Sequence, residues 1–198
     1  MKLHAPIETY LNTVRETCPQ VKEPALNFLR QRLTITTLAV KQYYVQAHTL
    51  QKSVGFVFSG LLRAYYVDRL GDEVTIRFAK EDTFATDYVA FLNQTPSRYL
   101  FQCLENTVMV NIPYTVMQEA YVRFPSLERY GRLIAEELFK SQQKRIESFL
   151  FESAVQRYSH FLLENPTLVN RISLSYLSSY LGIARPSLSR IRRKIMHP

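Results

Sequence analysis

Two short helical patterns separated by one glycine constrain the C-terminal part of this 198-residue chain more than any other feature. The first pattern consists of leucines three and four residues apart: Leu174, Leu177 and Leu181. The second pattern has the same spacing: Leu188, Ile191 and Ile195. Each set lies on one face of a helix. Gly182 separates them, where a tight turn needs a residue free to adopt a positive φ. The pattern predicts a helix-turn-helix.

Three further residues fit a helix-turn-helix. Ser173 stands directly before the first pattern, where its hydroxyl can cap the first helix. Ser178 supplies a small side chain that lets two helices cross closely, and Ile183 can fill the angle between them. Cap, crossing residue and turn therefore agree with the leucine spacing.

The same segment concentrates the positive charge of the chain. Residues 165–198 contain no Asp or Glu, while the whole chain has a net charge of +8. Six cations lie in this segment: Arg171, Arg185, Arg190, Arg192, Arg193 and Lys194. A local cationic surface attracts polyanions, and nucleic acid is the commonest polyanion in a cell. The charge indicates a DNA-binding segment.

The exposed side of the second helix carries the expected DNA contacts. Arg185, Ser189 and Arg190 lie near its start and middle, and an arginine can donate two hydrogen bonds to a guanine edge. Contacts to phosphates, which fix position without reading sequence, are expected from Ser187, Arg192, Arg193 and Lys194. The cap residue Ser173 completes the predicted set. A solvated basic helix with a buried apolar stripe is the alternative interpretation.

The stretch Leu-Gly-Ile-Ala-Arg-Pro-Ser-Leu-Ser-Arg at residues 181–190 resembles the recognition helix of the Crp/Fnr family of bacterial transcription regulators. The resemblance implies a homodimer with a cyclic-nucleotide-binding-type β-roll, a long dimerisation helix and a C-terminal winged helix-turn-helix. It further implies base contacts from Arg185 and Arg190, a palindromic double-stranded DNA target and RNA polymerase as a partner. Pro186 occupies a family position that often contacts bases, and a proline cannot make that polar contact. Because the sequence ends just after the second helix, a truncated or absent wing is expected.

The region before this segment predicts an α+β chain. Helical spacing occurs around residues 7–14 and 26–33, and β-branched and aromatic runs follow. The expected strands are residues 34–40, 54–58, 61–67, 73–78, 99–104 and 108–112. Their antiparallel arrangement around Gly55, Gly60 and Gly71 is similar to the Crp/Fnr β-roll, a double-stranded β-helix. We expect this domain at 1–125, a dimerisation helix at 126–152 and the helix-turn-helix domain at 153–198.

The long helix expected at 126–152 carries two apolar stripes, which imply two partners. The second stripe consists of Ala135, Phe139, Ile146 and Leu150. We assign the first to the seam between two subunits: Leu127, Tyr130, Ile134 and Leu138. A helix buried between two parts of one chain is the alternative.

The family resemblance also locates a place for an effector. Cyclic-nucleotide-binding members have Phe-Gly-Glu and, about ten residues later, Arg-Ser or Arg-Thr. Here Asp87 matches the glutamate and Arg98 the arginine, but Thr86 replaces the glycine and Tyr99 replaces the hydroxyl donor. We therefore expect no response to cyclic AMP. A cyclic-nucleotide site using Asp87 and Arg98, an Asp87–Arg98 ion pair, ordinary surface charges and a different effector remain alternatives.

Other classes of protein find less support in the sequence. A cupin-like small-molecule enzyme would need clustered metal ligands, but the four histidines, His4, His48, His160 and His197, are scattered. We expect no catalytic residue, metal or cofactor. With two cysteines, no apolar run long enough to span a membrane and no signal-peptide pattern, the expected location is the cytoplasm.

Overall fold

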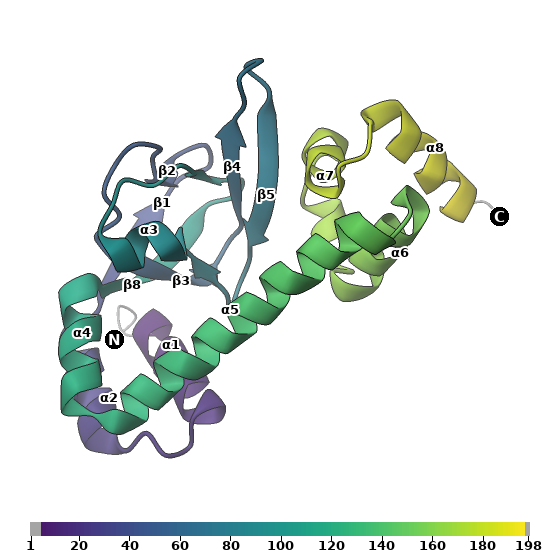
Figure 1. Cartoon of the computed structure of the whole chain (residues 1–198). Coiled ribbons are helices and arrows are strands. Elements are labelled where there is room, and N and C mark those ends of the chain that lie inside the picture. The colour runs from purple at the N-terminus through teal and green to yellow at the C-terminus, as the bar shows by residue number, and fades with distance from the viewer. Residues whose placement is uncertain (1–4, 197–198) are drawn as a thin grey trace. The chain divides into compact units, whose positions relative to one another are not determined.

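The structure is a computed structural model that describes residues 5–196 (Figure 1). Its helices are α1 (Ala5–Thr17), α2 (Glu23–Arg30), α3 (Tyr88–Asn93), α4 (Tyr114–Arg123), α5 (Pro125–Phe151), α6 (Ala154–Glu164), the 3-10 helix η1 (Leu168–Asn170), α7 (Leu174–Leu181) and α8 (Arg185–Met196). Its strands are β1 (Thr34–Leu38), β2 (Tyr43–Val45), β3 (Ser53–Ser59), β4 (Leu62–Val67), β5 (Glu73–Ala79), β6 (Phe84–Ala85), β7 (Leu100–Cys103) and β8 (Thr107–Pro113). The expected α+β class is confirmed.

The chain forms two compact units. Of the described residues, 5–66 and 77–136 make the N-terminal unit, and 67–76 and 137–196 make the C-terminal unit. The expected separation of the long helix from both neighbours is not observed, because α5 contributes its first part to one unit and its second part to the other. The end of the β4–β5 hairpin belongs to the C-terminal unit, where the Ser179 hydroxyl donates to the Glu73 carbonyl and accepts from the Thr75 N–H, both at 2.9 Å.

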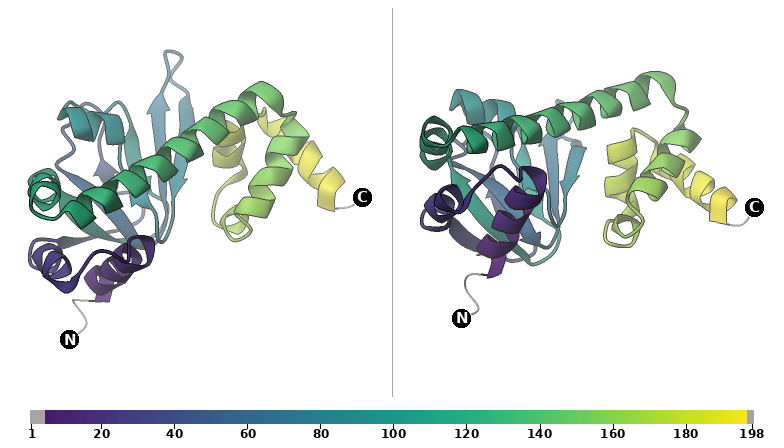
Figure 2. Two further views of the ribbon diagram at one scale, coloured as in Figure 1. Left: turned by 60° about the horizontal axis from the view of Figure 1, so that its bottom comes forward. Right: turned by 90° about the horizontal axis from the view of Figure 1, so that it is seen from below.

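The strands of the N-terminal unit form two four-stranded sheets, as expected for a β-roll. Their strand orders are β1-β8-β3-β6 and β2-β7-β4-β5. Antiparallel pairing places Thr34 opposite Asn111 in the first sheet and Leu62 opposite Cys103 in the second. Helix α1 packs on β3 and β8, and the two views of Figure 2 show it beside these strands.

An aromatic cluster lies in the core between α1 and the first sheet. The ring centroids of Tyr10 and Phe56 are 5.1 Å apart, and Phe84 lies 5.6 Å from Phe56. The helical spacing in α1 produces this contact, because Ile7, Tyr10 and neighbouring apolar residues of one face are all buried. The two N-terminal helices are thus part of the β-roll core.

The start of α5 is anchored in the same core, which corrects the predicted subunit seam. Leu127 and Tyr130 are only 2% and 6% exposed and pack with the core cluster, and Ile134 is partly buried against it. Leu138, in the C-terminal unit, is half-buried. The assignment of this stripe to a seam is therefore wrong for Leu127 and Tyr130, because they face their own subunit.

No helix within residues 5–196 is long and apolar enough to cross a membrane.

Candidate nucleic-acid interface

Helix α7 begins where the sequence predicts. Ser173 has extended backbone angles, and its hydroxyl accepts a hydrogen bond from the Tyr176 N–H at 3.1 Å. This satisfies one of the amide groups that a helix N-terminus leaves free. Leu177 and Leu181 of the predicted apolar face are buried, as is the predicted crossing residue Ser178, whereas Leu174 is half-buried.

The turn after α7 uses the left-handed conformation that Gly182 was expected to supply. Gly182 has φ 62° and ψ 40°, and the following Ile183 N–H donates to the Ser178 carbonyl at 3.0 Å. Ile183 is 7% exposed and fills the angle between the helices. Such a bond closes the C-terminus of a helix and redirects the chain.

Helix α8 begins one turn later. The Leu188 N–H donates to the Ala184 carbonyl at 3.0 Å, and Pro186 lies in the first turn, where a helix does not use the missing N–H. Leu188 is fully buried, whereas Ile195 is 37% exposed. The buried face of α8 is therefore shorter than the predicted stripe.

The polar residues of α8 form one basic surface of this helix. Arg185 and Arg190 are exposed, as are Arg193 and Lys194. Ser187, Ser189 and Arg192 are half-buried. The Arg190 Nη2 donates to the Ser187 hydroxyl at 3.3 Å, which directs the guanidinium back towards the start of the helix. Ser173 is separate from this surface because it lies at the start of α7.

Two residues that the sequence analysis missed act on α7 from other helices. Arg145 of α5 and Arg157 of α6 donate to the carbonyls of Tyr180 and Leu181, at 2.8 and 2.9 Å. Neither arginine belongs to a motif: Arg145 falls in a helix with many charged residues, and Arg157 lies in a short helix whose other charged residue is Glu164. Periodicity alone offered no signal that distinguishes them.

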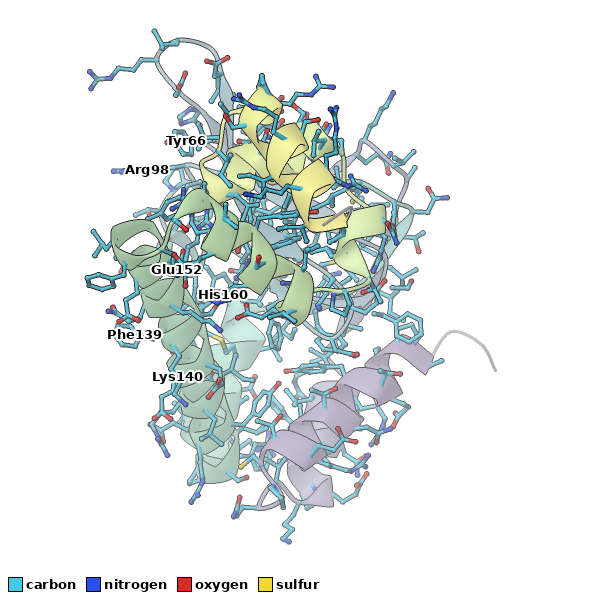
Figure 3. All side chains as sticks on the ribbon, turned by 90° about the vertical axis from the view of Figure 1, so that its right-hand side faces the viewer. Tyr66, Arg98, Phe139, Lys140, Glu152 and His160 are labelled. Carbon is cyan, nitrogen blue, oxygen red and sulfur yellow. The ribbon has the colours of Figure 1, made fainter. Side chains whose placement is uncertain are left out.

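Asp87 and Arg98, two of the three expected effector residues, are joined by a hydrogen bond from a main-chain N–H. Asp87 caps α3: its Oδ1 accepts from the Ala90 N–H at 3.3 Å, and its Oδ2 accepts from the Ser97 hydroxyl at 2.9 Å and from the Arg98 N–H at 3.4 Å. The contact to Arg98 therefore uses its amide, while its side chain is exposed (Figure 3). The Tyr99 ring lies 6.5 Å from that of Tyr66.

The sequence analysis missed two polar residues beside Asp87. Ser97 is fully buried, and Gln51 is 5% exposed and accepts from the Asp87 N–H at 3.0 Å. In the family motif a hydroxyl side chain follows the arginine. Here the hydroxyl of Ser97 stands one residue before Arg98 and donates a hydrogen bond to Asp87. Within residues 5–196 no group of three or more histidine, cysteine or carboxylate side chains has metal-binding geometry.

Comparison with known proteins places this arrangement in a known class of fold. No protein-family profile matches the chain, and no curated protein sequence matches it significantly. Solved structures do match, and they are Crp/Fnr regulators with a β-roll and a C-terminal helical domain. The resemblance expected from residues 181–190 is therefore confirmed at the level of the fold.

Three of these structures cover nearly the whole chain. FixK2 from Bradyrhizobium japonicum has a TM-score of 0.70 at 15% identity, covering 83% of this chain and 84% of its own. The c-di-GMP-responsive global regulator CLP of Xanthomonas campestris has a TM-score of 0.69 at 13% identity, covering 88% and 92%. A Crp/Fnr transcriptional regulator from Eubacterium rectale has a TM-score of 0.69 at 16% identity, covering 90% and 85%.

Proposed function

We propose that this chain is a sequence-specific DNA-binding transcription regulator of the Crp/Fnr type. The observation that carries the proposal is α8, which follows a complete cap and turn and exposes Arg185 and Arg190. Residues 165–198 contain no acidic residue that would repel a phosphate backbone. The fold shared with FixK2 and CLP supports the same role.

In this proposal the two exposed arginines read bases and the remaining cations hold phosphates. Arg185 lies in the first turn of α8, and residues near the start of a recognition helix reach furthest into the major groove. The Ser187–Arg190 hydrogen bond would reduce the freedom that Arg190 loses on binding. Arg193 and Lys194 in the last turn suit contacts to the flanking phosphates.

The exposed stripe of α5 is proposed as the seam of a homodimer. Phe139, Ile146 and Leu150 are 70%, 55% and 68% exposed, and they follow one another at spacings of seven and four residues. Such spacing forms one seam along a helix, and a second copy would cover it symmetrically. Two-fold symmetry then matches a palindromic operator, and RNA polymerase is the proposed further partner.

We further propose that cyclic AMP is not the effector. The Asp87 carboxylate, which would have to hold a ribose, already accepts hydrogen bonds from Ala90, Ser97 and Arg98. A nucleotide would have to replace these bonds, and each costs free energy to break.

Selection from a random duplex pool tests the proposed function. The purified full-length chain should enrich a palindrome, and the enriched duplex should bind more tightly than its scrambled version at the same salt concentration. Arg132→Ala is a matched control, since Arg132 is an exposed arginine on α5 that pairs with Glu136. Equal affinity for enriched and scrambled duplexes would contradict sequence-specific regulation.

A further inference from the structure

Two arginines close the C-terminal end of the first helix of the helix-turn-helix. A helix leaves its last carbonyl groups without partners inside the helix. Here the Arg145 Nη2 donates to the Tyr180 carbonyl at 2.8 Å, and the Arg157 Nε donates to the Leu181 carbonyl at 2.9 Å. Because the C-terminal end of a helix carries a partial negative charge, two cations at this end are favourable.

The same guanidinium groups are held by aromatic rings. The Arg145 Cζ lies 4.0 Å from the Tyr180 ring centroid and 4.9 Å from that of Phe149, and the Arg157 Cζ lies 5.3 Å from Phe149. The Phe161 ring packs 5.6 Å from that of Tyr180. The five side chains thus join α5, α6 and α7 in one cluster within the C-terminal unit.

Arg157 also spans the junction between α5 and α6. Its Nη1 donates to the Glu152 carbonyl at 2.6 Å, while Ser153 starts α6 with a capping box. A junction between two helices would be a natural pivot, because few main-chain bonds cross it. The bonds of Arg157 to Glu152 and Leu181 connect both sides of this junction, so the end of α5 and the helix-turn-helix are tied together.

We infer that Arg145 and Arg157 are positioning residues that fix the direction of α8 relative to the second half of α5. The inference rests on the proposed function. If that part of α5 forms the dimer seam, the two arginines set the distance between the recognition helices of the two subunits. Half-sites of a palindrome must then be about one helical turn apart, or about 34–36 Å. The arginines would control the tolerance for half-site spacing without touching DNA.

The test compares operators with different half-site spacing. Arg145→Lys and Arg157→Lys keep the positive charge but lose the planar fork of donors. We expect each variant to bind the selected operator about tenfold or more weakly, as expected for losing a charge-assisted hydrogen bond. The decisive measurement is the ratio of affinities for the selected operator and for operators lengthened or shortened by one or two base pairs. This ratio should fall towards one in both variants and stay unchanged in Lys140→Ala, which alters an exposed ion pair on α5 (Figure 3).

The outcomes separate this inference from the proposed function. If the wild-type chain prefers no duplex, the proposed function is wrong. If the folded lysine variants discriminate spacing as well as the wild type, the positioning role is wrong. If either variant fails to fold, amide hydrogen exchange on the wild-type chain tests the inference instead. We expect α7 and the second half of α5 to exchange as one cooperative unit. Independent opening of these two segments would overturn the inference.

Discussion

The ring of Phe149 on α5 lies against Gly182 in the turn between α7 and α8. A Cβ atom built on Gly182 would be 2.7 Å from the Phe149 Cε1, closer than carbon atoms approach in real contacts. Two features of this position therefore favour glycine. The backbone has a φ of 62°, and the Phe149 ring leaves no space for a Cβ atom. The sequence alone revealed the first feature, and the packing revealed the second.

Gly182→Ala should destabilise the C-terminal unit by more than its backbone angle explains. The left-handed conformation alone costs roughly 1–2 kcal/mol for an alanine. Gly71→Ala is a matched control, because Gly71 also has a positive φ but a Cβ there meets no atom within 4 Å. Urea unfolding should show the larger loss for Gly182→Ala, and Phe149→Ala should recover part of the difference. Equal losses at the two glycines would mean that the Phe149 contact has no energetic weight.

Arg185→Ala and Arg190→Ala should each cost about 1–3 kcal/mol of binding to the selected operator, since each removes a proposed base contact. Arg193→Ala should instead weaken binding to operator and random duplex by similar factors. Fluorescence anisotropy with both duplexes distinguishes these classes. If the affinity of each of the three variants fell by the same factor for the operator and for random duplex, Arg185 and Arg190 would not be the residues that read bases.

Ile146→Asp should yield monomers, because two-fold symmetry places the new carboxylates of both subunits in the same seam, where they are desolvated and repel each other. Sedimentation velocity measures the mass directly. Lys140→Asp introduces the same side chain outside the stripe and should leave the dimer intact. A dimeric Ile146→Asp protein would place the subunit contact elsewhere on the chain.

Alkaline pH should destabilise the N-terminal unit through Tyr10. Burial raises the pKa of Tyr10 from 10.0 to about 12. Above pH 10 the unfolded chain loses this proton while the folded chain keeps it, so stability present below pH 10 is lost as the pH rises towards 12. Two pKa units correspond to at most about 3 kcal/mol. Tyr10→Phe should reduce the slope of unfolding free energy against pH in this range. An unchanged slope in Tyr10→Phe would assign the effect to other tyrosines.

Cyclic AMP should leave the melting temperature unchanged. A ligand that binds only the folded state at a hundredfold excess over its dissociation constant would add about 2.7 kcal/mol of stability. A thermal-shift series with cyclic nucleotides measures this directly. A shift with cyclic AMP that disappears in Arg98→Ala would restore the family's sensing mechanism. Asp87→Ala should itself destabilise the chain by about 0.5–2 kcal/mol, through loss of the α3 cap.

Sequence patterns located the parts of the molecule that depend on near neighbours. The Ser173 cap and the Gly182 turn involve hydrogen bonds that span at most five positions, so these two roles could be predicted from residue type and spacing. The two stripes of α5 were also visible, but periodicity does not tell which stripe meets the chain's own core. Leu127 and Tyr130 are buried in the structure, so the stripe that contains them is the one that meets the chain's own core. The contacts of Arg145 and Arg157 span 35 and 24 residues, and no local pattern encodes contacts at such separations.

The hydrogen bonds of Asp87 have a consequence for how such a regulator would be controlled. In a sensor, the resting state leaves a vacancy that a metabolite fills, and its output follows metabolite supply. Here the acid at the matching position is occupied by amides and a hydroxyl of its own chain. Under the proposed function, DNA binding would therefore not follow the supply of a cyclic nucleotide that needs this acid. Any control by a small molecule would have to act through other contacts.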